Sequence, residues 1–157
     1  MNTEQSNLNC LTLISYRQAS QILESAMQQA QAHGSALSFV VVDSAGHLVA
    51  AARMDGAPFV TMEVARGKAF ACVATGGQSG RALRQRYVDH PMVWGNIASL
   101  GYGAPLLPAI GSLPVWVDGA LIGAVAASGG QAEVEEETLT RAIESIGGSV
   151  TPPVRAQ

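Results

Sequence analysis

The sequence is poor in charge, and in positive charge above all. Charged residues make up 13% of the 157 residues, Lys68 is the only lysine, and the formal net charge is −3. Binding to duplex DNA or RNA normally needs a dense basic surface, because neutralising phosphates supplies most of the affinity. The composition therefore argues against a nucleic-acid partner, although single arginines could still hold the carboxylates of a small acid.

Long apolar runs and cysteine clusters are missing as well. No stretch approaches the roughly 20 apolar residues that span a bilayer, and residues 1–7 lack the basic start and apolar run of a secretory signal. The two cysteines, Cys10 and Cys72, form no CxxC motif and no Cys/His cluster. We therefore expect a cytoplasmic protein with reduced thiols, no structural zinc site and no membrane partner.

Familiar catalytic signatures are absent too. The chain contains no GxSxG, no P-loop and no dinucleotide fingerprint in a βαβ unit. No two histidines have the spacing of metal ligands. Motifs alone therefore leave open whether the protein is an enzyme.

What the sequence does contain is enough apolar material for one core. Hydrophobic residues make up 48% of the chain, and a chain of this length buries roughly 70% of its extended surface on folding. We expect a flexible leader over residues 1–12, a single domain over 13–147 and a short proline-bearing tail over 148–157.

Periodicity and turn signals predict alternating helices and hairpins. Ser15 and Gln18 have the pattern of a capping box before a helix that ends near His33, and Asp118-Gly119 is typical of a type I′ hairpin turn. We predict strands over 38–42, 47–54, 112–117 and 120–128, helices over 60–74 and 133–146, one or two short helices within 78–100 and a glycine-rich loop over 101–111. Hairpins pair antiparallel, so the fold class is α/β of the α+β type rather than a parallel doubly wound sheet.

Three residues are candidates for catalysis. Lys68 lies on an alanine-rich helix and could donate as a point charge, form a Schiff base or act as a base if desolvated. Asp55 could orient Lys68, and His90 could serve as an acid or base. The structural alternatives are that Lys68 lies along apolar surface or pairs with Asp55 or an end carbonyl, that Asp55 caps a helix, and that His90 is a surface loop residue.

A larger set is expected to bind a ligand. Trp94 and Tyr102 could form aromatic walls, and Arg81 and Arg84 could hold carboxylates through bidentate contacts. The full set is Arg53, Gly56, Glu63, Arg81, Arg84, Trp94, Tyr102 and Gly103. The alternatives are a core position for Trp94 and a solvated helix face for the arginines. The acidic run over 133–137 most simply complements a helix N-terminus.

Several short segments follow one another in an order and at a spacing that plain strand and turn patterns do not explain. They are Val41–Leu48, then Arg53–Ala57 with Ala65–Ala69, then Leu113–Val115, Asp118–Gly119, Ile122–Val125 and Ser128–Gly130. Together they resemble the GlcG/HbpS family, which includes the C-terminal domain of PduO-type proteins and is labelled haem-binding or haem-degrading-like. The resemblance covers roughly residues 11–146.

The resemblance carries expectations of its own. It implies a profilin-like, three-layer α/β/α fold with a five-stranded antiparallel sheet, and a homo-oligomer, for which we expect an even number of subunits. Some family members bind haem and others are linked to corrinoid or diol metabolism. If haem is bound here, His90 is the expected iron ligand; otherwise we expect no cofactor.

Three functions remain open at this point. The first is a small-molecule binding protein whose ligand is haem or another flat organic molecule, held near Asp55, Lys68 and the glycine-rich loop. The second is a cofactor-independent enzyme of aromatic or organic acid catabolism that uses Lys68 and His90 for acid–base chemistry. The third is an oligomeric accessory protein of a catabolic pathway without chemistry of its own.

Overall fold

The computed structural model describes residues 11–154, so Cys10, most of the expected leader and the last three residues lie outside the described part. Its elements are α1 (Tyr16–Ala32), β1 (Ser38–Asp43), β2 (Leu48–Arg53), α2 (Val60–Ala74), α3 (Gly80–Asp89), α4 (Pro91–Ala98), β3 (Ser112–Val117), β4 (Ala120–Ser128) and α5 (Ala132–Glu144).

Most of the predicted elements are confirmed. The ranges predicted for α2, β3 and β4 match the observed ones, and the capping box of Ser15 and Gln18 is formed. Asp118 and Gly119 both have positive φ, at 49° and 79°, as a type I′ turn requires. The last helix starts one residue before its predicted range and stops short of Ile146.

The sheet has four strands in the order β2-β1-β4-β3, and every neighbouring pair is antiparallel. The predicted five-stranded sheet is therefore wrong for the described residues. Two hairpins supply four strands, and the segment before β3 offers no fifth. It contains Pro105 and Pro108, and its Gly101 and Gly103 have positive φ, so it does not extend as a regular strand.

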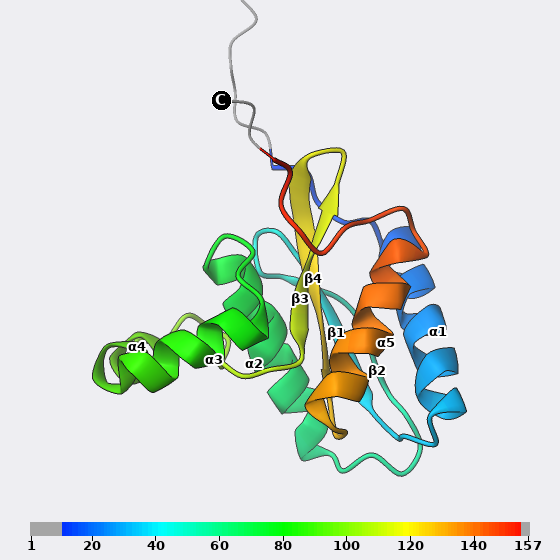
Figure 1. The fold of residues 1–157 in the computed structure, drawn as a ribbon, viewed down its shortest axis with the longest axis horizontal. Helices are drawn as coiled ribbons and strands as arrows, with labels where there is room; N and C mark the ends of the chain where they lie inside the picture. The colour runs from blue at the N-terminus through cyan, green and yellow to red at the C-terminus, as the bar shows by residue number, and fades with distance from the viewer. Residues whose placement is uncertain (1–10, 155–157) are drawn as a thin grey trace, which may run out of the picture.

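Alternate residues of β1 face different layers. Phe39 and Val41 belong to the core formed with α1 and α5, whereas Val40 and Val42 belong to the core formed with α2, because successive side chains of a strand point to opposite faces. Figure 1 shows α1 and α5 on one face of the sheet and α2 on the other. The predicted α/β/α layering is thus present.

Helices α3 and α4 form an arm, residues 80–98, that extends away from the sheet (Figure 1). No residue of α4 is buried, and its Met92 and Val93 are 79% and 55% exposed. A small cluster around Leu83 and Leu106, which Trp94 partly covers, joins the arm to α2. Across residues 11–154, no helix combines the length and apolarity needed to cross a membrane.

Candidate functional site

The lone lysine is buried in an ion pair. The Lys68 Nζ atom donates to Glu135 Oε2 at 3.1 Å and to the backbone carbonyl of Ala127 at 2.9 Å. The other carboxylate oxygen, Glu135 Oε1, accepts from the backbone N–H of Gly130 at 3.2 Å. The two side chains are only 8% and 4% exposed. This contact joins α2, the end of β4 and the start of α5.

Local sequence explains why the pair fits there. Small residues bring α2 close to the sheet, and Ala65 and Ala69 are fully buried against it. A Cβ on Gly111 would lie 2.7 Å from Lys68 Nζ, so only glycine leaves room for the ammonium group. Burial raises the pKa of the Glu135 carboxyl above its usual value, and Lys68 only partly offsets that effect.

Two expectations about this region need correction. The acidic run was interpreted most simply as complementing the N-terminus of the last helix; Glu133 and Glu135 do lie in the first turn of α5, but Glu135 is in addition buried and bound to Lys68. Asp55 was expected to orient or pair with Lys68, yet no hydrogen bond or ion pair joins them in the described residues. The sequence signal for a partner was the lysine itself, since a buried ammonium group needs an opposite charge.

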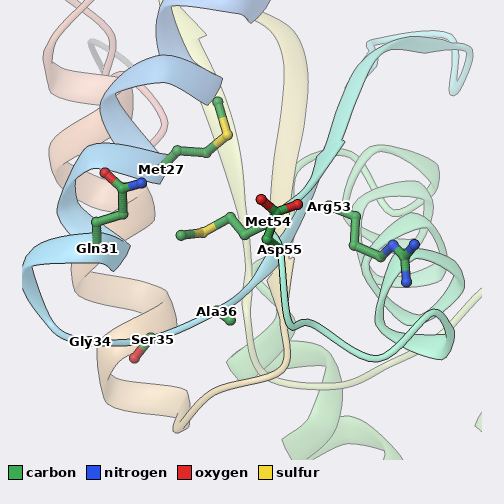
Figure 2. A pocket seen from close by; sticks show the side chains of 8 residues that line it. All are labelled: Met27, Gln31, Gly34, Ser35, Ala36, Arg53, Met54 and Asp55. Atoms are coloured by element: carbon green, nitrogen blue, oxygen red, sulfur yellow. The ribbon is translucent and has the colours of Figure 1, made fainter.

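Asp55 instead lines an open cleft of about 510 Å³ at the end of α1. Figure 2 shows Met27 and Gln31 of α1 and Met54 and Asp55 after β2 around this opening, while the Arg53 side chain points away from it. The other lining residues are Gly34, Ser35 and Ala36. Met27 and Gln31 had not been predicted, because no motif marks them.

Asp55 does not cap α2 either. Phe59 occupies the N-cap position and no side chain caps the helix. Gly56, one of the ligand-binding candidates, has a φ of 90°, a backbone conformation that favours glycine in a turn. The guanidinium of Arg53 donates to the carbonyl of Ala57 at 3.2 Å, across the same turn.

A second recess lies between the arm and the loop before β3. This groove, of about 370 Å³, is lined by Tyr87, Gly95, Ala98, Leu106, Leu107 and Pro108. The arginines of α3 lie close by: Arg84 is one helical turn before Tyr87 on the same face, and the Arg86 guanidinium lies 5.8 Å from the centre of the Trp94 ring.

The other predicted residues do not form one site. His90 is exposed at the junction of α3 and α4, and the Tyr102 ring lies 5.9 Å from that of Phe70 rather than in the groove. Gly103 is exposed and has positive φ, and Glu63 is exposed on α2. The Arg81 guanidinium donates hydrogen bonds to the Glu136 carboxylate. These bonds and the negative charge of Glu136 raise the pKa of the guanidinium.

Metal and thiol chemistry find little support in the described residues. In residues 11–154 no group of three or more His, Cys, Asp or Glu side chains could hold a metal ion. Cys72 is buried in α2, and burial raises the pKa of its thiol. Because the thiolate is the reactive form, this burial disfavours a reactive role for Cys72.

Comparison with known proteins identifies a matching family and a similar protein. A family model described as "Haem degrading protein HbpS-like" matches residues 14–144. Protein GlcG of Escherichia coli (strain K12) is 35% identical over 121 residues, which cover 74% of this chain and 81% of GlcG.

Solved structures agree. The crystal structure of a PduOC:heme complex aligns with a TM-score of 0.74 and 25% identity, covering 88% of this chain and 99% of that one. HbpS aligns with a TM-score of 0.76 and 24% identity over 93% of this chain and 98% of HbpS. The ORFY protein of Klebsiella pneumoniae aligns with a TM-score of 0.77 and 23% identity, covering 94% and 97%.

Proposed function

Because the chain belongs to the HbpS-like family of haem degrading proteins, we propose that it binds a small, flat organic molecule, with haem as the first candidate. The support from relatives is that one similar structure is a complex with haem. For this chain to bind such a ligand, its surface must hold a flat apolar molecule that carries carboxylates at its edge.

The groove beside the arm carries this proposal. Its walls are mostly apolar, with Leu106 and Leu107 on one side and Gly95 and Ala98 on the other. Its volume of about 370 Å³ lies within the range of small-molecule sites, and its open shape lets part of a larger ligand project into solvent. The site would take a flat hydrophobic molecule by its face.

Charge near the groove matches an acidic ligand. Arg84 and Arg86 are exposed, and no salt bridge engages either of them in the described residues. A guanidinium binds a carboxylate through two parallel hydrogen bonds. Haem carries carboxylates on one edge, so Arg84 would hold that edge while the groove holds the ring.

The residues that could face the iron are two. His90, the histidine expected from the sequence, is exposed where the arm bends but is not part of the groove wall. Tyr87 does line the groove and is 42% exposed. Imidazole and phenolate are both used as axial ligands, and axial identity governs the spectrum and potential of the iron.

The enzymatic alternative gains no favouring observation. Lys68 is held by Glu135 and Ala127 and lines none of the cavities described above. An amine held by a carboxylate and a backbone carbonyl is not free to attack a carbonyl until it is released. Acid–base chemistry by His90 alone stays a hypothesis.

A haemin titration followed by absorbance tests the proposal. Wild type is expected to give a saturable Soret band, and Arg84→Gln to weaken binding without moving that band. Of His90→Ala and Tyr87→Phe, the variant that removes the axial group is expected to shift the band. Arg17→Gln, an exposed arginine of α1 far along the chain from the arm, is the matched control. Unsaturable absorbance that matches an unrelated acidic protein would reject haem as the ligand.

We further propose that the protein forms a homo-oligomer with an even number of subunits. The exposed apolar side chains of the arm, among them Met92 and Val93, support this because a monomer rarely leaves a large apolar patch uncovered. Light scattering at micromolar concentration is expected to give twice the monomer mass or a higher even multiple. A stable monomer would contradict the proposal.

A further inference from the structure

The cleft at the end of α1 has a chemical character of its own. Its lining combines two thioethers, from Met27 and Met54, with the amide of Gln31, the hydroxyl of Ser35 and the carboxylate of Asp55. It is separate from the groove beside the arm, since the two cavities share no lining residue. A ligand near Asp55 was expected from the sequence, and the groups that line the cleft indicate which class of ligand the cleft would prefer.

Only one ionised side chain faces the opening. The Asp55 carboxylate lies at the mouth of the cleft and makes no hydrogen bond or ion pair within residues 11–154. Arg53 carries the one positive charge in the lining, but its side chain points away (Figure 2) and donates to the Ala57 carbonyl. Among the described residues, no cation is therefore paired with the Asp55 carboxylate in the cleft.

The helix that forms one wall adds to this field. α1 ends at Ala32, and Gln31 and Gly34 at that end line the cleft. The C-terminal end of a helix carries a partial negative charge, which basic residues of the last turn often balance. α1 has no basic residue in its last turn, and its last carbonyls accept from the backbone N–H groups of His33, Gly34 and Ser35. The helix dipole therefore adds a partial negative charge to the cleft without offering free carbonyl ligands.

The apolar part of the cleft is partly fixed in place. The backbone N–H of Leu37 donates to the Met54 sulfur at 3.5 Å, and Figure 2 shows the Met54 side chain extending from the segment after β2 toward α1, which carries Met27. Thioethers are polarisable and make favourable contacts with aromatic rings. A ligand with an apolar or aromatic body would lie against them.

We propose that this cleft binds an organic ammonium ion, with the ammonium group at Asp55 and the end of α1 and the apolar body on Met27 and Met54. The chemistry follows from what the lining offers: one unpaired carboxylate, the C-terminal end of a helix, a side-chain amide, and two soft apolar side chains. A carboxylate-bearing molecule such as haem would meet like charge here. The site is thus distinct from the proposed groove in place and in charge preference.

Methionine methyl NMR provides a direct test with three matched probes. Benzylammonium, benzyl alcohol and benzoate have similar bodies and differ in the charge of the head group. Benzylammonium is expected to shift the Met27 and Met54 methyl signals saturably, and to bind at least about threefold more tightly than benzyl alcohol, as expected for one partly exposed ion pair. Benzoate is expected to bind most weakly. The Met62 and Met92 signals, on α2 and the arm, serve as internal references.

Two variants separate charge at the site from charge in general. Asp55→Asn is expected to weaken benzylammonium binding about threefold while leaving benzyl alcohol unchanged. Asp118→Asn, which removes an exposed carboxylate from the β3–β4 turn, is expected to have no effect. Asp55 is exposed, so its variant should fold, and unchanged Met92 signals check this.

The proposal is overturned if the three probes bind equally, or if Asp55→Asn and Asp118→Asn behave alike. Shifts confined to Met92 would also overturn it, because they would place the ligand on the arm. None of these outcomes bears on the haemin titration, which uses residues of the groove.

Discussion

The chain has two kinds of charged site, and they differ in what surrounds them. Lys68 and Glu135 are sealed between α2 and α5, with both side chains under 10% exposed and their hydrogen bonds made to groups of the protein itself. Asp55 lies in an open cleft and makes no polar contact in residues 11–154. Sealed charges are used to hold elements together, whereas an open, unpartnered charge is available to a ligand.

The sharpest way to break this comparison is to remove one charge from each site. Lys68→Ala is expected to destabilise the fold by about 3–5 kcal/mol, because it leaves the Glu135 carboxylate buried without its partner. Asp55→Ala should cost about 0.5 kcal/mol or less, as for other surface substitutions. Urea unfolding of both variants measures the difference. The ion pair therefore points to a role of Lys68 in stability, whereas from the sequence it was a candidate for catalysis.

If Lys68→Ala unfolds at the wild-type midpoint, the pair adds nothing to stability. Lys68 would then become available again for the enzymatic hypothesis. If Lys68→Ala lost haemin binding without losing stability, Lys68 would likewise act on a ligand rather than on the fold.

A second comparison extends the contrast to apolar side chains. Leu139 of α5 is fully buried, whereas Leu100 after α4 is 69% exposed. Leu139→Ala is expected to cost about 2–5 kcal/mol, and Leu100→Ala about 0.5 kcal/mol or less. Chemical unfolding checks both. A large loss for Leu100→Ala would mean that the surface after the arm is covered in solution, as an oligomer contact would do.

Local patterns of the sequence predicted the elements well, and for a physical reason. The capping box of Ser15, the turn at Asp118-Gly119 and the small-residue spacing of α2 all act over a few residues. Such signals can be read without knowing the fold. The same local patterns predicted the four strands that the described residues form, whereas the five-stranded sheet implied by the family resemblance was wrong.

The candidate sites depended on pairings that no local pattern encodes. Glu135 lies 67 residues after Lys68 in the sequence, so the helix dipole explained its acidic neighbourhood equally well. Tyr87, rather than Trp94 or Tyr102, lines the groove because of how α3 lies against the loop before β3. The chemical types were identified from the sequence, but their partners were set by tertiary packing.

Replacing both residues of the ion pair tests whether the pair stabilises the fold through its charges or through packing. The double substitution Lys68→Met/Glu135→Leu is expected to recover most of the stability lost in Lys68→Ala, leaving a net change of about 1 kcal/mol or less in either direction. Buried ion pairs are often no more stabilising than apolar residues of similar volume. A double variant as unstable as Lys68→Ala would show that the hydrogen bonds to Ala127 and Gly130 are essential.

The smallest expected effect is a pH dependence, and it comes from Glu135. Burial holds the folded-state pKa of this carboxyl above its ordinary value of 4.5. The folded protein then binds more protons than the unfolded chain between these two pKa values, so stability falls as pH rises through that window. The contribution of Glu135 is fully present below pH 4.5 and lost above the raised pKa.

Unfolding free energies measured between pH 4 and 7 for wild type and Glu135→Gln test this. The wild-type value minus that of the variant should decrease as pH rises and then level off, whereas Glu137→Gln controls for a change of exposed charge on the same helix. A difference that grows with pH would mean that the attraction of Lys68 outweighs burial. In that case the sealed site would behave as an ordinary stabilising salt bridge.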